Sequence, residues 1–285
     1  MDRLFRIGDF CFCILSELSC AAPAHFCQFA IETGVPEYIY RLREVPSLPV
    51  LDGKQIVWRP DLEVRQEGEK EIRLIGIRGQ KEYYACYQEV SACEANIWVT
   101  GQMRGLMPSD TVYTSLFALE RRMIRYGGLI LHCAYIKYRG KGILFSGPSG
   151  IGKSTQAALW EQYRNSAVIN GDRALLRREN GRWLACGWPV CGSSGVCHRE
   201  DVPIHAIVML RQDDSNSTIR LSPAEAFGQL YPQITVNQWN PAFVRMALDG
   251  INNLIQQVPV WRLDCNMTED AVQCLESALF PDGTN

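Results

Sequence analysis

A glycine-rich segment near the middle of the chain limits the choice of fold more than any other feature of the sequence. It follows the apolar run 143–145, precedes a run with helical periodicity, and satisfies the pattern G-x-x-x-x-G-K-[ST]. Its residues, with the threonine that follows, are Gly147, Pro148, Ser149, Gly150, Ile151, Gly152, Lys153, Ser154 and Thr155. A strand, a loop of this kind and a helix in that order indicate a backbone that wraps around phosphate groups at a helix N-terminus.

The residue types in this loop predict ATP and Mg²⁺ as cofactors. Glycines let successive amide groups point at phosphate oxygens, and Lys153 supplies a mobile positive charge. The hydroxyl of Ser154 is expected to bind the magnesium ion. Two alternatives stay open. The motif could be a chance glycine turn before a helix, or a phosphate loop that is retained in an inactive protein.

Three further residues are candidates for chemistry. Asp172 follows the apolar run 167–169 at a distance that suits a second magnesium ligand, although Gly-Asp is also a common turn. Arg173 could form an ion pair with a phosphate group or with Asp172. His132 lies in an apolar strand, where a histidine is more often a packed core residue than a catalyst.

Composition narrows the class of protein. The 285 residues carry a formal charge of -2, which gives no global attraction for nucleic acid or membranes. Apolar runs such as 10–15 and 204–210 are far shorter than a membrane span, and no secretory signal is evident, so we expect a cytoplasmic protein. None of the 12 cysteines forms a CxxC pair, which favours reduced thiols. The group Cys186, Cys191, Cys197 and His198 is too loosely spaced to predict zinc.

The order of elements predicts two regions, 1–126 and 127–285. Short alternating runs from 5 to 101 indicate mostly antiparallel strands, and the period of apolar residues in 110–125 indicates one closing helix. Two strand-like runs, 129–138 and 142–146, form a predicted hairpin that leads into the glycine-rich loop. A strand is expected at 167–170, and helices at 154–164, 223–231, 241–257 and 269–279.

The stretch from His132 through the loop to Asp172 resembles the catalytic domain of the HPr kinase/phosphorylase family, which is related to phosphoenolpyruvate carboxykinase. In that family a histidine opens the strand before the hairpin, the loop is similar to G-x-S-G-x-G-K-S, and paired acids end the next strand. The resemblance covers about residues 128–280. It implies an α/β (α+β) fold with a P-loop kinase domain after a strand-rich region that could recognise the substrate. It also implies magnesium-dependent transfer of phosphate from ATP to a serine hydroxyl, with Asp172, Lys153 and His132 as catalytic residues.

The sequence departs from this family at two places. Gly171 stands where the family has the first of two acids, and the segment 187–195 is similar instead to HPr-kinase-like proteins of peptide-modification gene clusters. We therefore expect a kinase whose acceptor is a protein, a peptide or a small serine-like molecule. We expect it to bind neither nucleic acid nor membranes. Because members of the family often form oligomers, the resemblance also implies a possible homo-oligomer. The alternatives are an inactive nucleotide-binding partner protein and a small-molecule P-loop kinase. Such a kinase would need a lid with grouped arginines, and the arginines near the loop are Arg173, Arg177 and Arg178.

Overall fold

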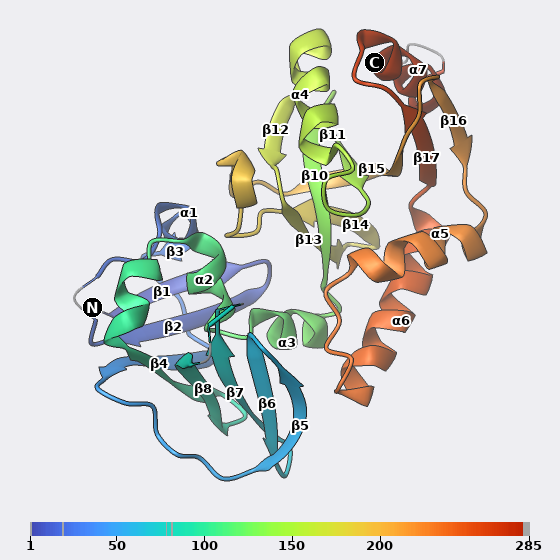
Figure 1. The fold of residues 1–285 in the computed structure, drawn as a ribbon. Coiled ribbons are helices and arrows are strands. Elements are labelled where there is room, and N and C mark those ends of the chain that lie inside the picture. Colours follow the sequence, from blue (N-terminus) through green and yellow to red (C-terminus); the bar gives the residue numbers. More distant parts are fainter. Residues whose placement is uncertain (1, 19, 78, 81, 282–285) are drawn as a thin grey trace. The chain divides into compact units, whose positions relative to one another are not determined.

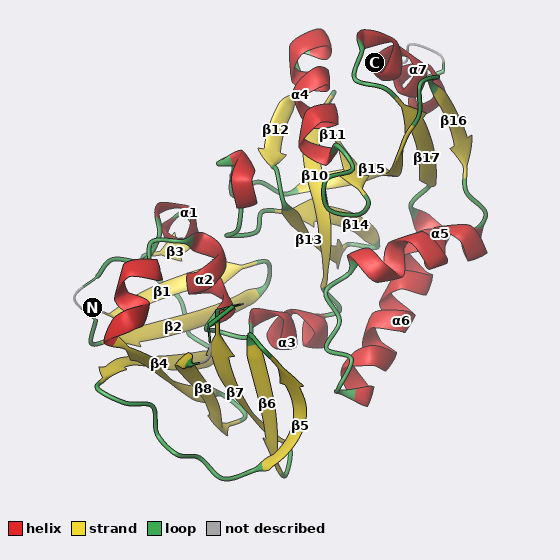
Figure 2. Ribbon diagram, in the orientation of Figure 1, coloured by secondary structure: helices red, strands yellow, loops and turns green. Residues whose placement is uncertain are grey.

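The computed structural model describes residues 2–18, 20–77, 79–80 and 82–281 (Figure 1). The chain divides into two compact units, Met1–Arg122 and Met123–Asn285. Each unit combines a sheet with helices, so the predicted mixture of α and β structure is confirmed (Figure 2).

One sheet forms the core of the first unit. Within the described residues it has nine strands in the order β3-β1-β2-β4-β9-β8-β7-β6-β5. Their bounds are β1 (Asp2–Ile7), β2 (Phe10–Ser16), β3 (Ala30–Ile31), β4 (Tyr38–Val45), β5 (Lys54–Arg59), β6 (Leu62–Glu67), β7 (Lys70–Gly76), β8 (Tyr83–Ser91) and β9 (Glu94–Thr100). Burial alternates along β4 and β9, as expected where one face of a sheet is covered.

The pairing in this sheet is mostly antiparallel, as predicted, but β4 lies parallel to both β2 and β9. Parallel neighbours need a long connection. The chain between β2 and β4 includes the short helix α1 (Ala24–Cys27) and β3, and the chain between β4 and β9 includes β5 to β8. The alternation of apolar and polar residues does not reveal whether neighbouring strands run parallel or antiparallel.

The prediction of one helix over 110–125 was wrong. The chain forms η1 (Gly101–Leu106), α2 (Asp110–Ser115), α3 (Leu119–Met123) and η2 (Ile124–Tyr126). Ala118 has a φ of 47°, outside the helical region, and it interrupts the helix. Residues 116–119 are all buried, so the periodic apolar positions belong to two short helices joined by a buried turn.

A buried cluster of charges ties α3 to the sheet of the first unit. Arg121 donates from Nε to Glu89 Oε1 at 2.9 Å and from Nη1 to Glu71 Oε2 at 2.7 Å. Arg73 donates to Glu120 at 2.6 Å, and Arg122 also donates to Glu89. We call this the arginine cluster; its members are Glu71, Arg73, Glu89, Glu120, Arg121 and Arg122.

The second unit begins with the predicted hairpin. Strands β10 (Leu129–Tyr138) and β11 (Lys141–Ser146) pair in antiparallel register from Cys133 opposite Ser146 to Tyr138 opposite Lys141. The turn between them has a φ of 50° at Arg139 and 72° at Gly140, the geometry of a two-residue turn that follows the twist of a hairpin. The hairpin is therefore confirmed.

The remaining strands of this unit are β12 (Ala167–Asn170), β13 (Arg173–Glu179), β14 (Arg182–Cys186), β15 (Val202–Gln212), β16 (Ser217–Arg220) and β17 (Val260–Cys265). Strand β11 pairs with β15 in parallel, and β15 pairs with β17 in parallel. The carboxyl ends of β11, β15 and β17 consequently lie at the same edge of the sheet.

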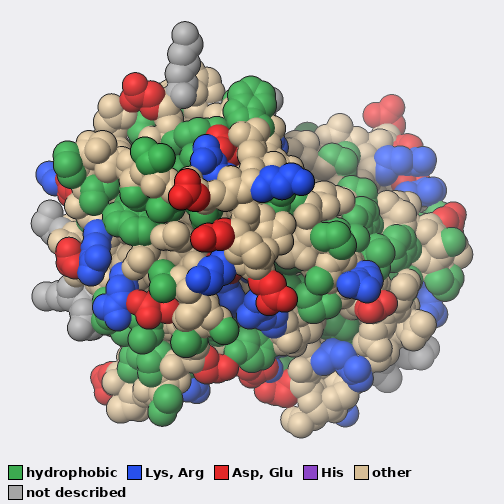
Figure 3. Space-filling model, turned by 90° about the horizontal axis from the view of Figure 1, so that it is seen from below, with side chains coloured by type: hydrophobic (Ala, Val, Ile, Leu, Met, Phe, Trp, Pro, Cys, Tyr) green, Lys and Arg blue, Asp and Glu red, His purple; other side chains and the backbone are tan. Residues whose placement is uncertain are grey.

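Helices cover both faces of this sheet. They are α4 (Lys153–Arg164), α5 (Pro223–Leu230), α6 (Pro241–Gln257) and α7 (Glu269–Leu279), close to the predicted ranges. Neighbouring residues of β10 enter different cores: Tyr135 packs with residues of α5 and α6, and Ile136 packs with residues of α4 and α7. Among the described residues, no helix combines the length and apolar character needed to cross a membrane. Blue and red side chains are intermixed on the face drawn in Figure 3, as the small formal charge of -2 leads one to expect.

Candidate functional site

The glycine-rich loop, residues 147–154, leaves the carboxyl end of β11 and enters α4. Gly150 has a φ of 80° and Gly152 a φ of 107°, values that favour glycine. A Cβ atom on either residue would have no neighbour within 4 Å, so the loop backbone faces open space at both positions. A backbone of this shape suits the close approach of an anion.

Lys153 lies at the start of α4 and is only 8% exposed. Its Nζ donates to the carbonyl oxygens of Gly147 and Pro148, each at 3.1 Å. Burial lowers the pKa of Lys153, and the nearby charge of Asp172 acts in the opposite direction. The ammonium group is thus held at the loop by two carbonyls, with no carboxylate of the described residues in direct contact. Ser154, the next residue, is exposed.

Asp172 lies in the turn between β12 and β13, beside β10. Its Oδ1 is 3.7 Å from His132 Nε2, and its Oδ2 is 3.2 Å from Arg173 Nε. Its backbone oxygen accepts a hydrogen bond from Cys133 N at 3.0 Å. Burial lowers the pKa of His132, as do the charges of Lys153 and Arg173, while Asp172 raises it. The structure therefore brings Lys153, Asp172, Arg173 and His132 together.

Asn170 organises this turn, and the sequence analysis did not single it out. The side chain is fully buried, and its Oδ1 accepts from the backbone nitrogens of Asp172 at 2.8 Å and Arg173 at 2.9 Å. Its Nδ2 donates to the carbonyls of Trp188 and Val190, both at 3.0 Å. An asparagine immediately before Gly-Asp is a known turn signal and could have identified it.

The segment 192–194 packs directly on Gly171 and Asp172. A Cβ atom on Gly171 would lie 2.1 Å from Ser194 Oγ, so the serine fills the space that a side chain at position 171 would need. A Cβ on Gly192 would lie 2.8 Å from Asp172 Oδ1. Ser194 Oγ donates to Cys191 O at 2.6 Å and accepts from Val196 N at 3.2 Å, which shapes the turn. At position 171, where the HPr kinase/phosphorylase family has an acid, Ser194 therefore occupies the space of the side chain.

The family model described as SynChlorMet cassette protein ScmC matches residues 103–279, more than half of the 285 residues. The chain belongs to the ScmC family. Among solved structures it is similar to the Hpr(Ser) kinase/phosphatase from Coxiella burnetii, at 13% identity and a TM-score of 0.30, over 54% of this chain and 95% of that chain. No curated protein matches.

The remaining candidates from the sequence are the group of cysteines with His198 and the arginines Arg173, Arg177 and Arg178. Across the described residues, no three His, Cys, Asp or Glu side chains converge where they could hold a metal ion, and no disulfide joins any of the twelve cysteines. Burial raises the pKa of Cys186 strongly. Arg173 and Arg177 lie in β13, and Arg177 pairs with Glu179 and Asp201, each at 3.1 Å.

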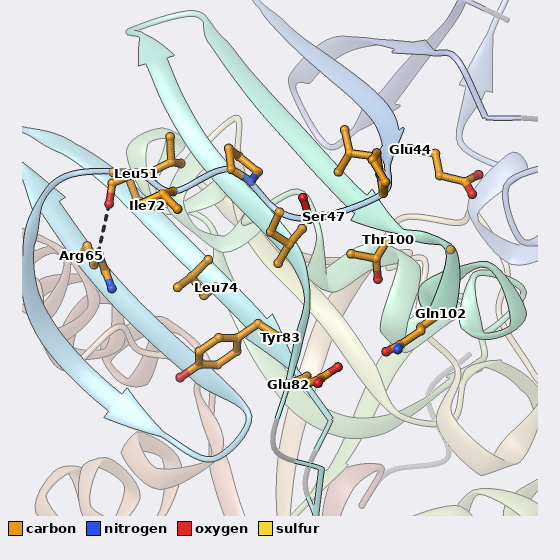
Figure 4. Close-up of a pocket in the computed structure, with 16 residues that line it drawn as sticks. Glu44, Ser47, Leu51, Arg65, Ile72, Leu74, Glu82, Tyr83, Thr100 and Gln102 are labelled. Carbon is orange, nitrogen blue, oxygen red and sulfur yellow. Dashed lines mark hydrogen bonds between the residues drawn. The ribbon is translucent and has the colours of Figure 1, made fainter.

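A cavity of about 1030 Å³ lies in the first unit of the ScmC-family chain and is shown in Figure 4. Apolar side chains of β7, β8 and the segment 46–51 line it, and Arg65 donates to Leu51 O at 3.0 Å at one end. None of the residues predicted to carry chemistry contributes to this cavity. Its size therefore does not make it the candidate site.

Proposed function

We propose that this protein is a phosphotransferase that moves the terminal phosphoryl group of ATP to a hydroxyl group, on a serine of a protein or peptide or on a small serine-like molecule. The observation that carries the proposal is the buried Lys153 ammonium, which donates to two loop carbonyls and is close enough to Asp172 for the carboxylate's charge to act on its pKa. A cation and a carboxylate beside an open glycine backbone are the groups that phosphoryl transfer needs.

The residues present fit a magnesium-bound nucleotide. The open backbone at Gly150 and Gly152 leaves room for phosphate oxygens, Ser154 offers an exposed hydroxyl, and Asp172 offers a carboxylate. When bound, magnesium would neutralise charge on the phosphates. Lys153 would exchange its two carbonyl partners for phosphate oxygens, which are stronger partners for an ammonium group.

In the proposed step, the oxygen of the acceptor hydroxyl forms a bond to the terminal phosphorus while the bond from that phosphorus to the bridging oxygen breaks. ADP leaves with the electron pair, and Asp172 takes the proton of the acceptor. His132, at 3.7 Å from Asp172, would contact the acceptor or the transferred phosphoryl group. With Gly171 in place of a second acid, Asp172 would act both as a magnesium ligand and as the general base.

The test is transfer from labelled ATP with magnesium to serine peptides, by the wild type and by Lys153→Ala and Asp172→Asn. Loss of positioned charge at Lys153 should lower the rate by at least about 10²-fold, and loss of the base at Asp172 by about 10²–10⁴-fold. The exposed Lys141→Ala and Asp249→Asn are matched controls that should retain the wild-type rate.

Two outcomes would redirect the proposal. Full activity of Asp172→Asn would remove that carboxylate from the mechanism. Nucleotide binding without transfer to any acceptor would favour the alternative of an inactive nucleotide-binding partner, which the filled space at Gly171 supports.

A further inference from the structure

A second cavity, of about 560 Å³, opens beside the glycine-rich loop. We call it the strand-end cavity. Its lining comes from the loop and the first turn of α4, from the end of β15 and from the end of β17. The residues used below are Ile151, Gln156, Asp213, Asp214, Asn266 and Met267.

The topology of the sheet makes this cavity a continuation of the loop. Strands β11, β15 and β17 are parallel neighbours, and the loop follows the carboxyl end of β11. The cavity lies at the carboxyl ends of β15 and β17. Ligands of α/β sheets bind at this edge, so a nucleotide with its phosphates on the loop has the cavity available for its other end.

Gln156 supplies a directional group in the wall of the cavity. It is 2% exposed, and its Nε2 donates to Asn266 O at 3.1 Å and to Cys265 Sγ at 3.3 Å. Because a backbone carbonyl can only accept, Asn266 fixes which end of the amide is the nitrogen. Oε1 has no hydrogen-bond partner among the described residues, which is costly for a buried oxygen. Because Gln156 lines the cavity, a ligand whose amino group reached Oε1 would supply the partner.

The rest of the lining suits a nucleoside. Ile151 and Met267, which is 75% exposed, offer apolar surface to a flat ring. Asp213 and Asp214 offer carboxylates, which accept hydrogen bonds from sugar hydroxyls and repel phosphate. The negative charge in the cavity and the positive charge of Lys153 at the loop would therefore orient a nucleotide along one direction.

From these contacts we infer that the strand-end cavity binds the adenosine part of the nucleotide, and that Gln156 selects a purine with an amino group at carbon 6. The inference rests on the proposed function for its phosphate end. Adenine carries an amino group at carbon 6, whereas hypoxanthine and guanine carry an oxygen there. An oxygen facing Gln156 Oε1 would leave both acceptors without a donor.

Calorimetry with the magnesium complexes of ATP, inosine triphosphate and inorganic tripolyphosphate tests the inference on the whole chain. The wild type should bind ATP about tenfold more tightly than inosine triphosphate, the discrimination that one buried hydrogen bond provides. It should also bind ATP more tightly than tripolyphosphate. Gln156→Met should bring ATP to the level of inosine triphosphate and leave tripolyphosphate binding unchanged, while the exposed Gln256→Met is the matched control.

Met267→Ala supplies a second readout at an exposed position, where unfolding is not expected. It should weaken ATP and inosine triphosphate equally, by a few-fold, without changing tripolyphosphate binding. Equal affinity of the wild type for ATP and tripolyphosphate would overturn the inference and leave the phosphate loop standing, and equal affinity for ATP and inosine triphosphate would overturn the role of Gln156. Failure to bind either ATP or tripolyphosphate would overturn the proposed function itself.

Discussion

Charged side chains are buried in both units, but their partners differ. In the arginine cluster, Arg121 meets two carboxylates at 2.7 to 2.9 Å. At the glycine-rich loop, the partners of Lys153 among the described residues are two backbone carbonyls at 3.1 Å, and His132 lies 3.7 Å from Asp172. Charges that are fully matched by each other hold a fold together, whereas charges with weak partners can exchange them for a ligand. The arginine cluster therefore has the charge pairing of a structural element, and the loop has that of a binding site.

The largest loss of stability is expected in the arginine cluster, where the buried charges are paired with one another. Arg121→Met leaves Glu71 and Glu89 buried without this guanidinium, and breaking a buried ion pair typically costs about 3–5 kcal/mol. Urea unfolding should show a loss of this size. Arg41→Met, at the more exposed pair with Glu94, is the control and should cost much less, because water screens the pair. Equal losses for the two variants would mean that burial does not distinguish the cluster.

A smaller effect is expected at the candidate site, where packing rather than charge is tested. Gly171→Ala would force its Cβ against Ser194, and overpacking of this kind costs about 1–3 kcal/mol. The double variant Gly171→Ala with Ser194→Gly should recover most of the loss in thermal unfolding. Gly228→Ala in α5, where a Cβ meets nothing within 4 Å, should keep or raise the stability. A loss at position 171 that Ser194→Gly does not relieve would show that the two residues do not compete for space.

The smallest effect concerns pH and should separate the two units. Burial lowers the pKa of His205, whose Nε2 lies 3.0 Å from Leu279 O, below the ordinary 6.5. The unfolded chain then binds protons more readily, so stability of the second unit should fall as pH drops through 6.5. Burial alone would raise the pKa of Glu89, but Arg121 and Arg122 outweigh it and the net pKa is lowered. Its contribution should persist until the pH falls below the ordinary 4.5.

Hydrogen exchange between pH 8 and 5 can follow both units in one sample. The segments of the second unit should lose protection first, and His205→Gln should reduce that loss. A first unit that loses protection together with the second, or a His205→Gln protein with an unchanged pH dependence, would contradict the assignment.

The sequence alone was sufficient wherever structure depends on neighbouring residues. The turn at Arg139 and Gly140, the strand Ala167–Asn170 and the helices Pro241–Gln257 and Glu269–Leu279 lie where turn chemistry and periodicity predicted them. These features depend on local backbone preference and on the spacing of apolar residues, and both can be read along the chain.

Tertiary structure decided everything that depends on residues far apart in the sequence. It set β4 parallel to β2 and β9, and it broke the helix predicted over 110–125 at Ala118 because four successive residues are buried there. It also placed Ser194 in the space beside Gly171, and assembled the strand-end cavity from the glycine-rich loop, the start of α4 and the ends of β15 and β17. Such contacts arise from packing between segments, for which a linear pattern of residue types carries no direct signal.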